Sequence, residues 1–252
     1  MNPNPPPDEA DEAYWNDSGL RDLFASLPGE SAETITADIN DLGRLHRIVR
    51  ERPCVTALEF GIGHSTVVLA HAMEMNEREH GAVMGERASR NSQLFQVFTV
   101  DTSEAWIRHT MGRLPPALGA RVHPTHSPAS ATTFAGRLCH TYDRLPDVVP
   151  DFIYLDGPDP NEVTGSVAGL TFSIPERTAI AADLLVMEPT LLPGTVIVVD
   201  GREANVRFLT RNLQRPIEVT RDRDVSIIEL VEPRLGTVDV IGVDVLGRPG
   251  ER

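Results

Sequence analysis

Val55-Thr-Ala-Leu-Glu59-Phe-Gly61-Ile-Gly63-His-Ser65 is the stretch of sequence that decides the expected fold. Val55 to Phe60 is a short, nearly continuous apolar run, which is typical of a strand buried on both faces of a sheet. Two glycines then allow a tight turn, and Thr66 to Met75 follows as a predicted helix. A strand, a glycine turn and a helix open a βαβ unit, so we expect a parallel sheet.

The rest of the chain repeats this alternation of strands and helices. Further strands are predicted at residues 95–100, 121–124, 151–155 and 195–199, and the runs 217–220 and 225–231 flank a polar turn as a hairpin would. A helix is predicted at residues 176–191, and residues 238–245 alternate as an extra strand would. We therefore predict an α/β protein: a single doubly wound, Rossmann-like domain with a seven-stranded, mostly parallel sheet and an antiparallel C-terminal hairpin strand.

The two ends of the chain suggest its domain organisation. Residues 1–17 are rich in proline and acid and are predicted to form a disordered tail. Residues 18–252 are predicted to form one domain, made of N-terminal helices, a core and a C-terminal extension at 18–52, 53–232 and 233–252. Residues 158–175 form a long connection without periodicity, and such connections often act as lids.

Composition excludes several classes of function. The 252 residues carry a net charge of −14, which disfavours nucleic acid and anionic membrane as partners. The chain contains no lysine and all 23 basic residues are arginine, so a catalytic lysine is excluded. No apolar run is long enough to cross a bilayer and no signal-peptide pattern is present, so we expect a cytoplasmic protein. Cys54 and Cys139 form no metal-type cluster.

Carboxylates stand at the ends of four predicted strands. Glu59, Asp101, Asp156 and Asp200 each end or follow an apolar run. Ligands of doubly wound sheets bind beyond the carboxyl ends of the strands. We therefore expect these four side chains at one binding cleft.

The glycine turn at residues 61–63 gives poor support for a phosphate site. Thr66 stands where the dinucleotide fingerprint has its third glycine, and the nucleotide-triphosphate loop requires a lysine. A glycine turn preceded by Glu59 suits a ligand with a positive group. Asp101 could hold the ribose of either kind of ligand, so an oxidoreductase that binds NAD or another nucleotide on the same fold remains an alternative.

Four motifs in order resemble class I S-adenosylmethionine (SAM)-dependent methyltransferases. Residues 55–65 look like motif I, and Phe98-Thr-Val-Asp101 resembles motif II. Residues 151–157 look like the strand-four motif, and residues 191–200 are similar to the strand-five motif. The resemblance covers roughly residues 38–232, and the terminal hairpin matches the family's sixth and seventh strands. Ser65 replaces the usual third glycine, as it does in small-molecule O-methyltransferases of this type.

The resemblance implies an enzyme that transfers the methyl group of SAM to a small molecule, at a hydroxyl oxygen. Glu59, Gly61 and Gly63 would line the methionine part of SAM, with Ser65 beside them. Asp101 would hold the ribose. His126 or Ser127 would lie near the adenine, and Asp156 would lie beside the transferring methyl group. A homodimer, and a non-catalytic SAM-binding protein that acts through a partner, stay open.

Some small-molecule O-methyltransferases bind a divalent cation through acids after strands four and five. Asp156 and Asp200 stand at these places and suit Mg²⁺. Two features depart from the catechol type: Gly201 follows the strand-five acid where that type has Asn, and no lysine base is present. A third ligand could come from three residues: Asp159, Glu203 or Asn205.

Without a metal, a side chain must accept the proton of the substrate hydroxyl. The candidates are Asp156, Asp159, His126 and Glu203. Each has a structural alternative: Asp159 could brace its loop, and Glu203 could pair with Arg202 on the surface. Arg202 could instead hold an acidic substrate.

Overall fold

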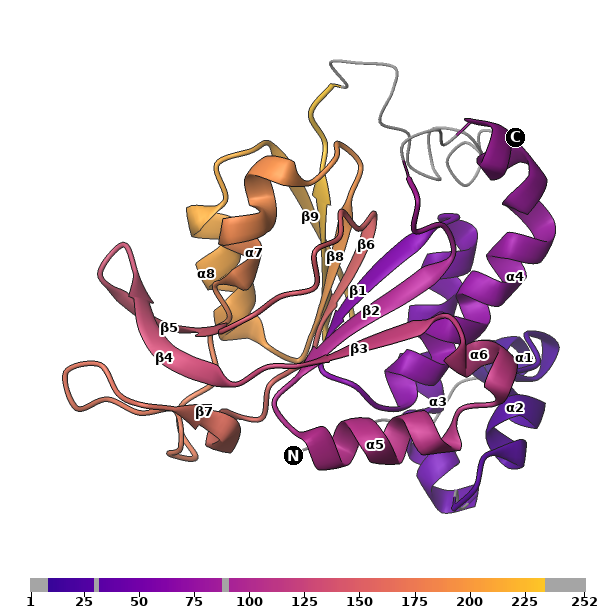
Figure 1. Ribbon diagram of the computed structural model, residues 1–252, viewed down its shortest axis with the longest axis horizontal. Helices are drawn as coiled ribbons and strands as arrows, with labels where there is room; N and C mark the ends of the chain where they lie inside the picture. Colours follow the sequence, from indigo (N-terminus) through magenta and orange to yellow (C-terminus); the bar gives the residue numbers. More distant parts are fainter. Residues whose placement is uncertain (1–8, 30–31, 88–90, 234–252) are drawn as a thin grey trace.

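The main sheet of the computed structural model, which describes residues 9–29, 32–87 and 91–233, contains seven strands (Figure 1). Their order is β3-β2-β1-β6-β8-β10-β9; the first five are parallel, and β10 pairs antiparallel with both β8 and β9. This arrangement confirms the predicted doubly wound, Rossmann-like sheet with its terminal hairpin. The strands are β1 (Thr56–Phe60), β2 (Gln96–Asp101), β3 (Val122–His126), β6 (Phe152–Leu155), β8 (Val196–Asp200), β9 (Ile217–Asp222) and β10 (Val225–Leu230).

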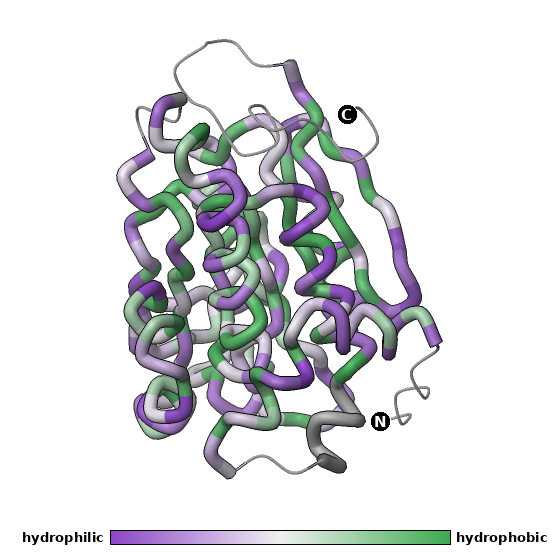
Figure 2. The backbone as a smooth tube through the Cα atoms, turned by 90° about the vertical axis from the view of Figure 1, so that its right-hand side faces the viewer, coloured by the Kyte–Doolittle hydropathy of each residue, from purple (hydrophilic) through white to green (hydrophobic). Residues whose placement is uncertain are grey.

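Helices cover both faces of this sheet, so the central strands are buried on both sides. Neighbouring residues of one strand enter opposite cores: Ala57 packs in the core that contains the N-terminal helices, and Leu58 packs in the core that contains α7 and α8. In Figure 2, hydrophobic segments run through the interior of the molecule, behind helices that carry both hydrophobic and hydrophilic residues. The helices are α1 (Glu9–Asp17), α2 (Leu20–Ser26), α3 (Ala32–Glu51), α4 (His64–Arg87), α5 (Glu104–Arg113), α6 (Pro116–Gly119), α7 (Asp183–Met187) and α8 (Glu203–Asn212).

A second, three-stranded sheet lies beside the main one and was not predicted. It consists of β4 (Ala129–Phe134), β5 (Arg137–Tyr142) and β7 (Val163–Thr164), in the order β5-β4-β7. Figure 1 shows the β4–β5 hairpin extending away from the main sheet. The sequence of β4, Ala-Ser-Ala-Thr-Thr-Phe, is no apolar run and alternates only weakly, so periodicity does not reveal it.

The prediction of a disordered tail over residues 1–17 is wrong for residues 9–17. These residues form α1, in which Trp15 is fully buried and packs against Phe24 with 5.2 Å between ring centroids. One large aromatic residue anchors a segment whose composition is otherwise polar. Residues 1–8 and the predicted strand at 238–245 lie outside the described residues, as does all but the first residue of the C-terminal extension.

Two predicted helices have different lengths in the structure. α4 runs on to Arg87, because its polar second half still buries Asn76 and Met84. The helix predicted at 176–191 is reduced to α7 and one 3-10 turn, Glu188–Thr190. The chain before α7 is held extended beside β5, because His140 N donates to Ile180 O at 2.8 Å and Ala182 N donates to His140 O at 3.0 Å. In the part of the chain that the structure describes, no helix is both long and apolar enough to cross a membrane.

Candidate active site

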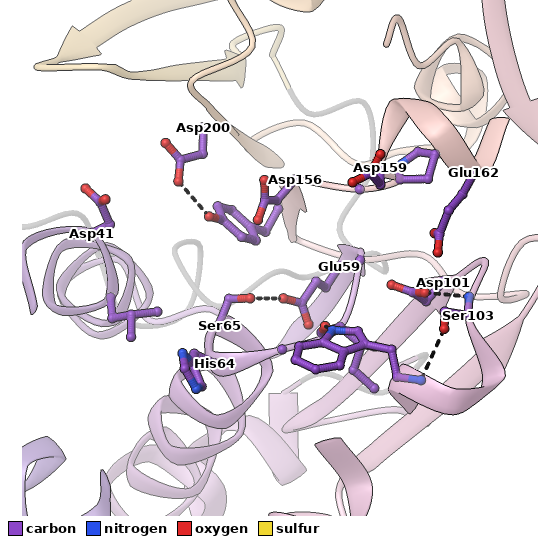
Figure 3. Close-up of a pocket in the computed structure, with 18 residues that line it drawn as sticks. Asp41, Glu59, His64, Ser65, Asp101, Ser103, Asp156, Asp159, Glu162 and Asp200 are labelled. Carbon is purple, nitrogen blue, oxygen red and sulfur yellow. Dashed lines mark hydrogen bonds between the residues drawn. The ribbon is translucent and has the colours of Figure 1, made fainter. Parts of the chain in front are cut away.

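A cleft of about 580 Å³ opens at the carboxyl ends of β1, β2, β6 and β8. Its volume is within the range of small-molecule sites. The four predicted strand-end acids, Glu59, Asp101, Asp156 and Asp200, all line it (Figure 3). The parallel register brings them to one edge of the sheet, as expected. The other lining residues are Asp41, Leu42, Gly61, Ile62, Gly63, His64, Ser65, Ser103, Trp106, Tyr154, Gly157, Pro158, Asp159 and Glu162.

Glu59 is buried beneath the glycine turn that follows β1, where only 1% of the residue is exposed. The Ser65 hydroxyl donates to Oε1 of Glu59, and the Thr66 hydroxyl donates to Oε2 at 2.6 Å. Thr66 also accepts a hydrogen bond from Gly63 N at 2.9 Å. Ser65 and Thr66, which stand where related glycine motifs have their third glycine, therefore hold the turn in place. Burial raises the pKa of Glu59 to about 8, so a positive group in the cleft would favour its ionised form.

Asp101 ends β2 and is 8% exposed. Its Oδ1 accepts a hydrogen bond from Ser103 N at 2.7 Å, while Ser103 caps α5 by accepting from Trp106 N at 3.2 Å. Capping by Ser103 leaves the Asp101 carboxylate facing the cleft, where it can accept hydrogen bonds from hydroxyl groups. Burial raises the pKa of Asp101 above its ordinary value.

Trp106 forms the part of the cleft wall that lies against the glycine turn. Its indole Nε1 donates to Ile62 O, and its ring stacks on His109 with 5.0 Å between centroids. The residue nevertheless remains 46% exposed. A fixed, exposed aromatic face of this kind suits a flat ring of a ligand.

The turn after β6 packs directly against the turn after β1. Gly157 N donates to Phe60 O, and a Cβ atom built on Gly157 would lie 2.7 Å from Gly61 N. Only glycine fits at this place, since real Cβ atoms do not approach backbone atoms so closely. This contact fixes Asp156 relative to Glu59 across the floor of the cleft.

Tyr154, Asp156 and Asp200 form the other side of the cleft. The Tyr154 hydroxyl donates to Oδ2 of Asp200 at 2.9 Å (Figure 3). Burial raises the pKa of Asp200 to about 6, and the neighbouring Asp156 and Asp41 contribute. Arg202 donates to the carbonyl oxygens of Asp156 and Pro158 and lies 3.9 Å from Oδ1 of Asp156. Arg202 thus braces the loop after β6, and its guanidinium is engaged there.

The predicted Mg²⁺ site receives no support. Among the residues that the structure describes, no group of three or more His, Cys, Asp or Glu side chains is arranged to hold a metal ion. Asp156 and Asp200 do face one cleft, but the three candidates for a third ligand serve other contacts. Asn205 clamps Ala181 through two hydrogen bonds of 2.8 and 3.1 Å, and Glu203 pairs with Arg207 and Arg221.

Three predicted site residues have structural contacts of their own. His126 lies outside the lining of the cleft, with Nε2 3.0 Å from Thr102 O. Ser127 is buried, also outside the lining, and its hydroxyl oxygen accepts from Arg144 N at 2.8 Å. These contacts give no support to a role near adenine or as a base. Asp159 does line the cleft, and its Oδ1 also caps the 3-10 turn Pro160–Glu162.

Sequence reasoning missed several lining residues because they come from elements without a motif. Asp41 and Leu42 reach the cleft from α3, Trp106 from α5, and Glu162 from the loop before β7. The helical period places Leu42 on the buried face of α3, but no pattern shows that Asp41 borders a cleft. Among these residues, only Trp106 could have been noticed in the sequence, as a tryptophan near the start of the helix that follows β2.

Comparisons with known proteins give no family for this chain. No protein-family model matches it, and a search of curated proteins finds no significant match. Among solved structures, an SAH-bound methyltransferase of Podospora anserina shares 12% identity over 90% of each chain, with a TM-score of 0.44. A precorrin-6y C5,15-methyltransferase of Geobacter metallireducens shares 12% identity over 82% of this chain and 91% of its own, with a TM-score of 0.42. A protein of Corynebacterium glutamicum shares 8% identity over 92% and 94%, with a TM-score of 0.39. Likenesses this low carry no argument about function, so the functional inference rests on the cleft.

Proposed function

We propose that this chain is a SAM-dependent methyltransferase that acts on a small molecule. The observation that carries the proposal is the charge of the cleft. Seven of its lining residues are carboxylic acids, and the only basic residue among them is His64. A dinucleotide would bring its negatively charged pyrophosphate into this field, whereas SAM brings a positive sulfonium and an ammonium group. The charge therefore favours SAM over NAD.

The residues present fit SAM along the row of strand ends. Asp101 would accept hydrogen bonds from the ribose hydroxyls, and the exposed face of Trp106 would pack against the adenine. The backbone of Gly61 and Gly63 would border the methionine part, above the buried carboxyl of Glu59. When bound, SAM supplies an electrophilic methyl group that requires little further activation.

The side chains at the other end of the cleft would align the acceptor. The finer proposal is transfer to a hydroxyl oxygen, with Asp156 accepting the proton. Asp156 is exposed to the cleft, and desolvation by the surrounding protein raises its pKa above the ordinary value, which makes it a better proton acceptor than a free aspartate. His126 lies outside the cleft lining and Asp159 is engaged as a cap, so Asp156 is the residue proposed for this role.

Calorimetric titration with SAM, S-adenosylhomocysteine (SAH) and NAD tests the proposal. We expect SAM and SAH to bind and NAD not to bind. Asp101→Asn keeps the shape of the side chain but removes the charge, and it should weaken SAH binding on the order of ten-fold or more. Asp147→Asn is the matched control, because Asp147 is exposed and lies outside the cleft. Binding of NAD with no binding of SAM or SAH would overturn the proposal in favour of an oxidoreductase.

A further inference from the structure

The end of the cleft at β8 carries negative charge that the proposed cofactor does not need. Asp101, Glu59, Asp156 and Asp200 stand on the adjacent strands β2, β1, β6 and β8. Strands lie about 4.8 Å apart, so Asp101 and Asp200 are separated by roughly 14 Å along the sheet edge. With the ribose at Asp101 and the methyl group near Asp156, the region of Asp200 lies beyond the cofactor, on the acceptor side.

Asp200 differs from the other acids at this end in its partner. Arg44 lies 3.3 Å from Asp41, and Arg202 lies 3.9 Å from Asp156. Asp200, in contrast, accepts its hydrogen bond from the neutral hydroxyl of Tyr154, and no arginine pairs with it in the described part of the chain. A carboxylate in the field of further carboxylates, without a cation of its own, is a place where a bound cation is stabilised.

We propose that the methyl acceptor carries a protonated amine, and that this ammonium group binds Asp200 beside Tyr154. The inference rests on the proposed function, because the cleft and its row of strand ends define the site. The carboxylates that line this end of the cleft favour an acceptor with a positive charge. The raised pKa of Asp200 agrees with it, since an ammonium group would offset the repulsion from Asp156 and Asp41.

The geometry gives each side chain a part in binding. The free lone pairs of the Asp200 carboxylate accept N–H bonds from the ammonium, while Tyr154 holds the carboxylate in place. Asp156 lies between this anchor and the glycine turn, where the group to be methylated would sit. The amine is thus the group by which the acceptor is held, and a neutral analogue of the same shape should bind poorly. An acidic acceptor is disfavoured for the same reason.

A binding experiment with a matched pair of probes tests the inference. The probes are 1,4-diaminobutane, which is doubly protonated at neutral pH, and the uncharged 1,4-butanediol, each titrated by NMR into protein saturated with SAH. We expect the diamine to bind and the diol not to bind. Asp200→Asn should weaken diamine binding on the order of ten-fold or more, because losing one charge-assisted hydrogen bond lowers affinity by about this factor. Asp147→Asn, which removes an equal charge outside the cleft, should leave it unchanged.

The outcomes separate this inference from the proposed function. SAH affinity of Asp200→Asn close to that of the wild type shows that the variant is folded and the cofactor end intact. Failure of SAH to bind the wild type overturns the proposed function. The amine site is then tested separately, by titrating the diamine into the protein without SAH. Equal binding of diamine and diol, or equal weakening by Asp147→Asn, would overturn the amine site. Displacement of the diamine by Mg²⁺, but not by sodium chloride of the same ionic strength, would assign Asp200 to a metal instead.

Discussion

Replacing Gly157 by alanine should separate the two turns that form the floor of the cleft. The added Cβ would lie 2.7, 2.8 and 2.9 Å from Gly61 N, Gly61 Cα and Phe60 C. All three are backbone atoms, and ordinary contacts begin at 3.4 Å, so the turns must move apart by up to about 0.7 Å. No flexible side chain is available to absorb this movement.

The cost of this substitution has two parts. Overpacking in a rigid environment costs about 1–3 kcal/mol, and loss of the hydrogen bond from Gly157 N to Phe60 O adds about 1 kcal/mol. The lower entropy of the unfolded chain returns only about 0.4–1 kcal/mol. We therefore expect a net destabilisation of about 1–3.6 kcal/mol, or a fall in Tm of about 2–14 °C for a chain of this size. SAH binding should weaken as well, because Asp156 moves relative to the glycine turn.

Thermal unfolding and SAH titration of three proteins test this reasoning. Gly112→Ala is the control, because its Cβ would meet nothing within 4 Å and the residue lies inside α5. The control should be unchanged or more stable by up to about 1 kcal/mol. A Gly157→Ala protein with wild-type Tm and wild-type SAH affinity would refute the close apposition of the two turns.

Three further predictions follow from single side chains. SAM is cationic and favours ionised Glu59, whose pKa is raised to about 8 by burial, so SAM affinity should rise from pH 6 to pH 8 and binding should release protons. Calorimetry in buffers of different ionisation enthalpy measures both effects, and Glu59→Gln should reduce both. Burial lowers the pKa of His46 to about 3, so the contribution of the neutral side chain to stability is present above pH 6.5 and is lost as the pH falls, by up to about 1.4 kcal/mol per pH unit. Urea unfolding should show that the free energy of unfolding falls less between pH 7 and pH 5 in His46→Gln than in the wild type. Trp106→Ala should weaken SAH binding by roughly two- to ten-fold with little change in Tm, because Trp106 is 46% exposed. An unchanged affinity would remove Trp106 from the cofactor site.

The sequence was sufficient to predict the parts of the fold that depend on continuous apolar runs. The central strands could be recognised because they are buried on both faces, and the acids that end them reach one cleft because parallel strands share an edge. Glu59, Asp101, Asp156 and Asp200 were therefore predictable as a group.

The remaining features depend on contacts between distant segments. α1 forms because Trp15 is buried against Phe24, which composition does not show. The predicted helix at 176–191 is short because Asn205 and β5 hold the preceding chain extended. The partner of Ser127 could not be predicted for the same reason: its hydroxyl oxygen accepts a hydrogen bond from Arg144 N, 17 residues away. Tertiary hydrogen bonds of this kind have no periodic signature in the sequence.

A crystal structure of the protein with SAH tests the central claim most directly. The account predicts SAH in the cleft, with its ribose hydroxyls bonded to Asp101, its amino acid part along Gly61 and Gly63, and its sulfur facing the turn at Asp156. SAH bound in this orientation would establish the cofactor and show the direction from which the acceptor approaches. A cleft without SAH at saturating concentration, or SAH with its ribose away from Asp101, would contradict it.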